Sequence, residues 1–288
     1  MLSKLNSLLR HASQPKFHKS TKDELFSIDL TDKVNHPGDI TFFIPTVIAL
    51  AHEKRLVDCK ENYGIISLFL FSEDIVKKPV KYTKLIRAFK KNDIPSSENT
   101  FFINFGNSEE YSIARWIFDM FDLTMSFDDA VSQASKNFYK KNISNYSNII
   151  NEFELPKKYI LLSLETMSGK RLGKFGAYPS EKAQADWMNF IYKKLMHSNL
   201  PVIVTGTGNQ LPFDLSGLEY FDIRCKTSID QLARMIVCEG CELVFSRDNL
   251  ASHLCGIIKP NSLTMFPRSF LTKMEYKWIE RRFFNVFK

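Results

Sequence analysis

Short runs of apolar residues alternate with longer stretches of helical periodicity along most of the chain. A short apolar run is typical of a buried strand, and apolar residues spaced by three and four positions are typical of a helix that packs on a sheet. The pattern predicts strands at 26–30, 64–71, 100–105, 157–164, 200–206, 241–246 and 261–266. It predicts helices at 111–121, 180–197, 228–239 and 249–258. This alternation is typical of the α/β class, with parallel sheets and helices on both faces.

A polar, proline-containing stretch at 142–158 divides the pattern into two halves. We therefore predict two Rossmann-like domains that face a cleft, at 22–156 and 157–267. A basic segment at 1–21 precedes them, and a helix with one apolar face is predicted at 268–288.

Composition limits the class of protein. The chain has 288 residues, 44% of them hydrophobic, which suits two packed cores and excludes a disordered chain. No run approaches the roughly 18–20 apolar residues of a membrane span, and the first twenty residues lack the apolar core of a signal peptide. Five cysteines favour reduced thiols over a disulfide framework. We expect a cytoplasmic protein.

Charge is concentrated at the two ends. The net charge is +7, with +5 in residues 1–22 and +4 in residues 268–288, which leaves −2 for the residues between them. Two basic ends on a nearly neutral body favour attraction to an anionic membrane surface or a phosphorylated substrate over binding of nucleic acid. Ordinary solubility explains the same charges, so this interpretation stays open.

Asp39 is the first candidate for chemistry. It ends the stretch His36-Pro37-Gly38-Asp39, which lies between a predicted strand and a predicted helix. One interpretation is a turn whose carboxylate caps the helix. The other is a carboxylate held beside the carboxyl end of the first strand, where open α/β sheets bind their ligands.

Three further stretches offer groups that bind phosphate. Hydroxyl and cationic side chains occupy 163–181, two glycines follow a predicted strand at 205–210, and polar side chains follow another strand at 247–253. The candidates are Ser163, Lys170, Lys174, Gly206, Gly208, Asp248, Asn249 and His253. Each has a structural alternative, which is a solvated loop, a tight turn, a helix cap or a half-buried histidine. Cys238 and Cys241 lack a second cysteine pair, and only His253 and Cys255 are available to complete a zinc site, so we expect no metal.

Three blocks, in order, resemble the bacterial heptosyltransferase family, glycosyltransferase family 9, which builds lipopolysaccharide core. The amino-terminal block is "GDITFFIPTVIAL" at 38–50, and the strand-plus-glycine block is "LPVIVTGTG" at 200–208. The long carboxyl-terminal block at 227–267 contains helix, strand, Asp, His, helix, Pro and strand in the family's order.

The resemblance implies a GT-B type enzyme with acceptor on the first half and nucleotide sugar on the second. It implies inverting transfer without a metal or cofactor, and a last helix that crosses back onto the first half. Asp39 matches the family's catalytic base, Lys170 or Lys174 its phosphate-contacting lysine, and Asp248, Asn249 and His253 its diphosphate motif. The implied partners are ADP-heptose, a lipid-linked or phosphorylated glycan acceptor and the inner face of the inner membrane.

The chain departs from the family after Asp248, where Asn249 and Leu250 replace Ser or Thr and Gly. A side chain at Leu250 keeps a phosphate farther from the backbone than glycine does, so another nucleotide sugar or a loss of activity stays open. A polysaccharide pyruvyltransferase and a non-catalytic glycan-binding relative are the alternative functions.

Overall fold

A computed structural model describes residues 24–31, 36–77, 83–89, 100–104, 113–142, 148–164, 181–207, 214–246, 249–258 and 263–264. Its first half contains a parallel sheet in the order β2-β1-β3-β4. The strands are β1 (Leu25–Asp29), β2 (Leu56–Lys60), β3 (Thr83–Phe89) and β4 (Thr100–Asn104). The helices are α2 (Pro37–Thr41), α3 (Ile44–His52), α4 (Ile113–Asp119), α5 (Phe127–Asn142) and α6 (Asn148–Glu152), with short 3-10 turns η1 (Ile66–Leu68) and η2 (Ser72–Asp74).

The second half contains another parallel sheet, in the order β7-β6-β5-β8-β9. Its strands are β5 (Tyr159–Ser163), β6 (Val202–Val204), β7 (Tyr220–Asp222), β8 (Cys241–Ser246) and β9 (Leu263–Thr264). Its helices are α8 (Glu181–Ser198), α9 (Ile229–Val237) and α10 (Leu250–Ile258). Two parallel sheets with interleaved helices confirm the predicted α/β class.

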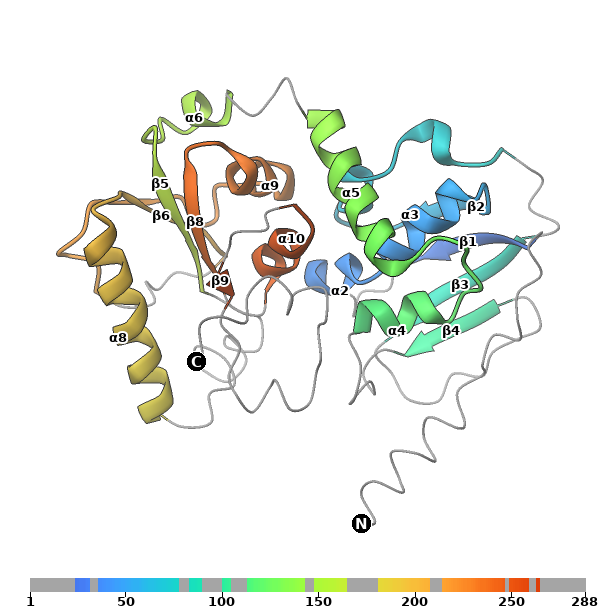
Figure 1. Cartoon of the computed structure of the whole chain (residues 1–288), viewed down its shortest axis with the longest axis horizontal. Coiled ribbons are helices and arrows are strands. Elements are labelled where there is room, and N and C mark those ends of the chain that lie inside the picture. Colours follow the sequence, from blue (N-terminus) through green and yellow to red (C-terminus); the bar gives the residue numbers. More distant parts are fainter. Residues whose placement is uncertain are drawn as a thin grey trace, which may run out of the picture.

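Alternation along β5 separates the two faces of the second sheet. Tyr159 and Leu161 pack in the cluster that contains α9 and α10, whereas Ile160 and Leu162 pack with Ile191 on α8. Because successive strand residues point to opposite faces, a strand buried on both sides is apolar throughout. Figure 1 shows α8 on the outer side of this sheet and α9 and α10 on the inner side, toward the first half.

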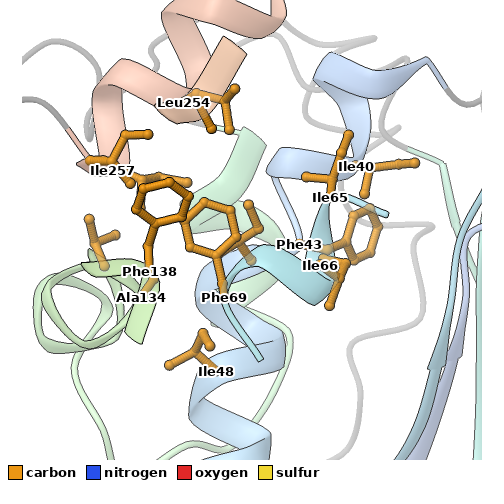
Figure 2. Close-up of a cluster of buried hydrophobic side chains, with 14 of the residues drawn as sticks. Ile40, Phe43, Ile48, Ile65, Ile66, Phe69, Ala134, Phe138, Leu254 and Ile257 are labelled. Atoms are coloured by element: carbon orange, nitrogen blue, oxygen red, sulfur yellow. The ribbon is translucent and has the colours of Figure 1, made fainter. Parts of the chain in front are cut away.

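The inner cluster continues from the second half into the first. Leu254 and Ile257 of α10 lie beside Phe138 of α5 and belong to the same buried cluster as Phe69 and Ile48 (Figure 2). The hydroxyl of Tyr139 on α5 also donates to the carbonyl of Ile258, at 2.7 Å. The two halves are therefore joined by shared apolar packing.

One predicted strand is wrong. Residues 64–71 form the 3-10 turn η1 and its flanks instead of a strand. The buried side chains Ile65, Ile66, Phe69 and Leu70 are spaced as on one side of a helix, and Phe69 packs on Phe138 with 5.6 Å between ring centroids. A short apolar run does not distinguish a strand from a helical turn without such spacing.

Strands β2, β3 and β7 and helix α5 have no counterpart among the sequence predictions. β3 lies inside its sheet but carries Lys84, which pairs with Glu24, and Arg87, whose Nε lies 3.3 Å from Asp29 Oδ2. These ion pairs place charged side chains on an interior strand, so the strand lacks an apolar pattern. Within the described residues, the other predicted strands and helices are confirmed within a few residues of their ends, whereas the helix predicted at 268–288 lies outside them.

Several predictions about organisation stay predictions. The domain limits, the cleft and the GT-B arrangement of the halves are not determined by the two sheets. Both basic ends of the chain, at 1–21 and 268–288, lie outside the described residues. Within the described ranges, no helix is long and apolar enough to cross a membrane.

Removing the ring of Phe138 tests the packing between the halves. We expect Phe138→Ala to lower the free energy of unfolding by about 3–5 kcal/mol. The reason is that this side chain of α5 is fully buried against Phe69 and α10. Tyr139→Phe, the adjacent control, keeps its ring and loses one hydrogen bond, at a cost of about 1 kcal/mol. Urea denaturation measures both, and equal effects of the two substitutions would contradict this packing.

Candidate functional site

In each sheet, the first strand lies in the interior, and later strands were added on both sides of it. β1 lies between β2 and β3, and β5 lies between β6 and β8. In open parallel sheets, ligands bind outside the carboxyl ends of the strands at this switch point. The residues that follow β1 and β5 are therefore the first place to look for a site.

Three hydroxyl side chains form a row at the carboxyl edge of the second sheet, which we call the hydroxyl row: Thr205, Ser163 and Ser246. Ser163 pairs in register with Ser246, and the backbone N–H of Thr205 donates to Leu162 O at 2.9 Å. By strand alternation, the row lies on the face that carries Leu161, which is the side of α10.

The hydroxyl row is buried, with Thr205, Ser163 and Ser246 at 2%, 5% and 1% exposure. Thr205 Oγ1 has no hydrogen-bond partner among the described residues. A buried hydroxyl without a partner is costly in a folded protein unless water or a ligand satisfies it. The row therefore has the capacity to hydrogen-bond a polar ligand.

Asn249 caps helix α10 and ties it to β5. Its Oδ1 accepts from Ser252 N at 3.2 Å, and its Nδ2 donates to Ser163 O at 2.8 Å. The hydroxyl of Ser252 in turn accepts from Asn249 N at 3.2 Å. The sequence offers Asp248 or Asn249 as this cap, and among the described residues Asn249 fills the role. Because both ends of the Asn249 amide make hydrogen bonds within the protein, its contribution to a ligand is chiefly to fix Ser163.

Asp39 lies on the short helix α2, which follows β1 in the chain. Its Oδ2 accepts from the backbone N–H of His36 at 3.0 Å, so it closes the amino-terminal turn of that helix. Asp39 is half-buried. The capping interpretation is therefore confirmed, while a catalytic role remains a prediction.

Helix α2 contacts the amino-terminal end of α10, and His253 lies in that contact. The imidazole of His253 is 4% exposed and meets the ring of Phe42 edge to face, with 5.0 Å between centroids. A β-carbon added to Gly38 would lie 3.1 Å from His253 Cδ2 and 3.9 Å from Leu250 N. This contact brings the helix that carries Asp39 against the end of α10 that is tied to Ser163.

Charged side chains also line the carboxyl edge of the first sheet, which the sequence analysis did not single out. Asp29 ends β1 beside Arg87 of β3 and Lys60 of β2. Burial alone would raise the pKa of Asp29, but hydrogen bonds from Thr31 and the charges of Arg87 and Lys60 hold it below its usual value. The available sequence signal was an acid at the end of a predicted strand; its pairing with Arg87 depends on the register of β3, which the sequence did not predict.

The remaining predicted residues divide into two groups. Lys170, Lys174, Gly208 and Asp248 lie outside the described residues. Gly206 follows Thr205 with a φ of 143°, a conformation that favours glycine, and its carbonyl accepts from Cys225 N at 2.8 Å. Its turn geometry accounts for the glycine without a ligand.

Cys238 and Cys241 are buried in the apolar cluster. In the part of the chain that the structure describes, no group of three or more His, Cys, Asp or Glu side chains is arranged to hold a metal ion.

The fold and this site define an α/β protein with two parallel sheets and polar side chains at the carboxyl edge of each. No protein-family model matches the chain, and no curated protein matches it. Among solved structures, the chain is similar to the glycosyl transferase family 9 from Veillonella parvula DSM 2008, at 9% identity and a TM-score of 0.45. The match covers 85% of this chain and 82% of that one. The three sequence blocks resemble the same family.

The cap at α10 is testable by substitution of Asn249. We expect Asn249→Ala to lower the free energy of unfolding by about 1–3 kcal/mol, because it removes both the cap and the hydrogen bonds to Ser163. Asn249→Ser keeps a cap acceptor and loses only the reach to Ser163, so it should cost about 1 kcal/mol. Chemical denaturation that finds both variants as stable as the wild type would contradict this assignment.

Proposed function

We propose that the chain is an inverting glycosyltransferase that transfers a sugar from a nucleotide diphosphate donor to a surface-glycan acceptor. The observation that carries the proposal is the contact of α2 with α10, through Gly38 and His253. It joins the segment after β1, which bears Asp39, to the end of α10 that is hydrogen-bonded to the hydroxyl row. An acid beside the edge where a polar ligand binds has the placement that a general base needs.

Asp39 is a better candidate for the base than Asp29. The carboxylate of Asp29 is held by Arg87 and Thr31, and its lowered pKa makes it a weaker proton acceptor. Asp39 accepts a backbone hydrogen bond from His36 through Oδ2 and follows the residue that touches His253. In the proposed step, the Asp39 carboxylate takes the proton from the acceptor hydroxyl as that oxygen attacks the anomeric carbon. The nucleoside diphosphate leaves with the electrons of the broken bond.

The donor is assigned to the carboxyl edge of the second sheet. Buried hydroxyls at Thr205, Ser163 and Ser246 supply hydrogen-bonding groups there. The cations expected from the resemblance, Lys170 and Lys174, belong to the loop that follows Ser163 in the sequence. Charge neutralisation by lysines is the basis for proposing a reaction that needs no metal.

The resemblance makes ADP-heptose the first donor to test and a lipopolysaccharide core intermediate the first acceptor. Release of nucleoside diphosphate from a panel of nucleotide sugars, with and without acceptor, measures the activity directly. Consumption of phosphoenolpyruvate in place of a nucleotide sugar would favour the pyruvyltransferase alternative, and binding without turnover would favour the non-catalytic one.

Asp39→Asn tests the base. The amide retains an acceptor for His36 N, so we expect the fold and donor binding to persist while kcat falls by about 10²-fold or more. Steady-state kinetics and calorimetric binding of the donor separate the two effects. Asp29→Asn serves as the control, because it removes the carboxylate at the carboxyl end of β1 and leaves Asp39 in place. A near-normal kcat in Asp39→Asn would contradict the assignment.

Substitution of the lysines tests the proposed handling of the diphosphate. Lys170→Ala or Lys174→Ala should raise the Kd for the nucleotide sugar, because a cation that offsets the diphosphate charge is lost. Isothermal titration of donor against the variants measures this, with Lys136→Ala on the exposed side of α5 as the control. Wild-type activity that requires added Mg²⁺ and disappears with a chelator would contradict the metal-independent proposal.

A further inference from the structure

Gly38 has a contact that explains the absence of a side chain at this position. Its backbone φ is not in the left-handed region that favours glycine, so conformation alone does not require it. A β-carbon there would lie 3.1 Å from His253 Cδ2 and 3.4 Å from His253 Nε2, closer than ordinary van der Waals contact. The small size of Gly38 is therefore matched to the His253 ring.

The His253 ring has little room to retreat from Gly38. It is 4% exposed, and Phe42 on the next turn after α2 packs against it edge to face. Its helix is also fixed, since Asn249 ties α10 to β5 and Leu254 and Ile257 pack into the inter-half cluster. An added methyl group at position 38 would therefore displace α2 more readily than α10.

We infer that Gly38 and His253 are positioning residues, a size-matched pair that sets the distance between Asp39 and the donor edge. This inference rests on the proposed function for its catalytic consequence. Asp39 follows Gly38 directly and is held within α2 by its bond to His36 N. A displacement of α2 thus carries the base away from the hydroxyl row and leaves the local geometry of the carboxylate intact.

Gly38→Ala tests the pair. The added β-carbon would require the neighbouring atoms to move by a few tenths of an ångström. Since a misplacement of about 1 Å costs roughly 10²-fold in rate, we expect kcat to fall by roughly 3- to 10-fold. The KM for the donor should stay within about twofold, because the hydroxyl row belongs to the second half and does not move. Gly217→Ala is the matched control: its methyl would lie 2.9 Å from Tyr192 Oη, the tip of a side chain on α8, and should leave kcat unchanged.

Replacement of His253 by a smaller side chain distinguishes a role in positioning α2 from a general loss of packing. In His253→Asn the ring is gone, so adding Gly38→Ala should cost less than about twofold in kcat, a non-additive result typical of residues in contact. If Gly38→Ala lowers kcat by the same factor in the wild type and in His253→Asn, the inference is overturned. An unchanged kcat in Gly38→Ala, or a rise in donor KM that matches its fall in kcat, also overturns it.

Crystal structures keep this test independent of the proposed activity. If the wild-type chain transfers no sugar, the proposed function fails, and the position of α2 relative to β5 still decides this inference. A displacement of α2 in Gly38→Ala that is reversed in the double variant supports it. An α2 that stays in place in Gly38→Ala overturns it.

Discussion

The burial of α10 between the two halves is the interaction on which the rest of the described structure depends. Every residue from Ala251 to Ile258 is buried, so this helix has no solvent-facing side. One side packs toward β8 and α9, and another meets α5 and α2 in the first half. A helix that is buried all round persists only inside a protein, where its apolar side chains are removed from water. The same packing holds the two sheets in a fixed relation.

This packing constrains what the amino-terminal end of α10 is able to do. A helix end has backbone N–H groups without helical partners, and such groups commonly bind anions. Here Asn249 and Ser252 bond to each other's backbone N–H groups, and Gly38 approaches Leu250 N. These groups at the amino-terminal end of α10 are therefore engaged within the protein, and the proposed donor site relies instead on the hydroxyl row and on Lys170 or Lys174.

Two acids of the first half, Asp29 and Asp39, differ in the side chains and helices that surround them. Asp29 is the last residue of β1, and Asp39 lies ten residues later on α2. Arg87 and Thr31 engage Asp29, which stabilises its charged form and joins β1 to β3. Asp39 instead caps a five-residue helix that touches α10. Asp39 thus lies on a helix that contacts the second half, whereas Asp29 is bonded within the first sheet.

The sequence by itself determined the α/β class and most of the second half, because these depend on local periodicity. It indicated a cap before α10 but left Asp248 and Asn249 as alternatives, and the structure shows Asn249 in that role. The sequence did not determine β3, whose charges are neutralised by partners on neighbouring segments, or the turn at 64–71, in which Phe69 packs on Phe138 of α5. Asp39, Ser163 and Asn249 were recognised as candidates, but the contact of Gly38 with His253 was not. That contact joins residues more than 200 positions apart, and its distance follows from the packing of α10 against both sheets. Local pattern carries no information about such a distance, so only the tertiary structure decided it.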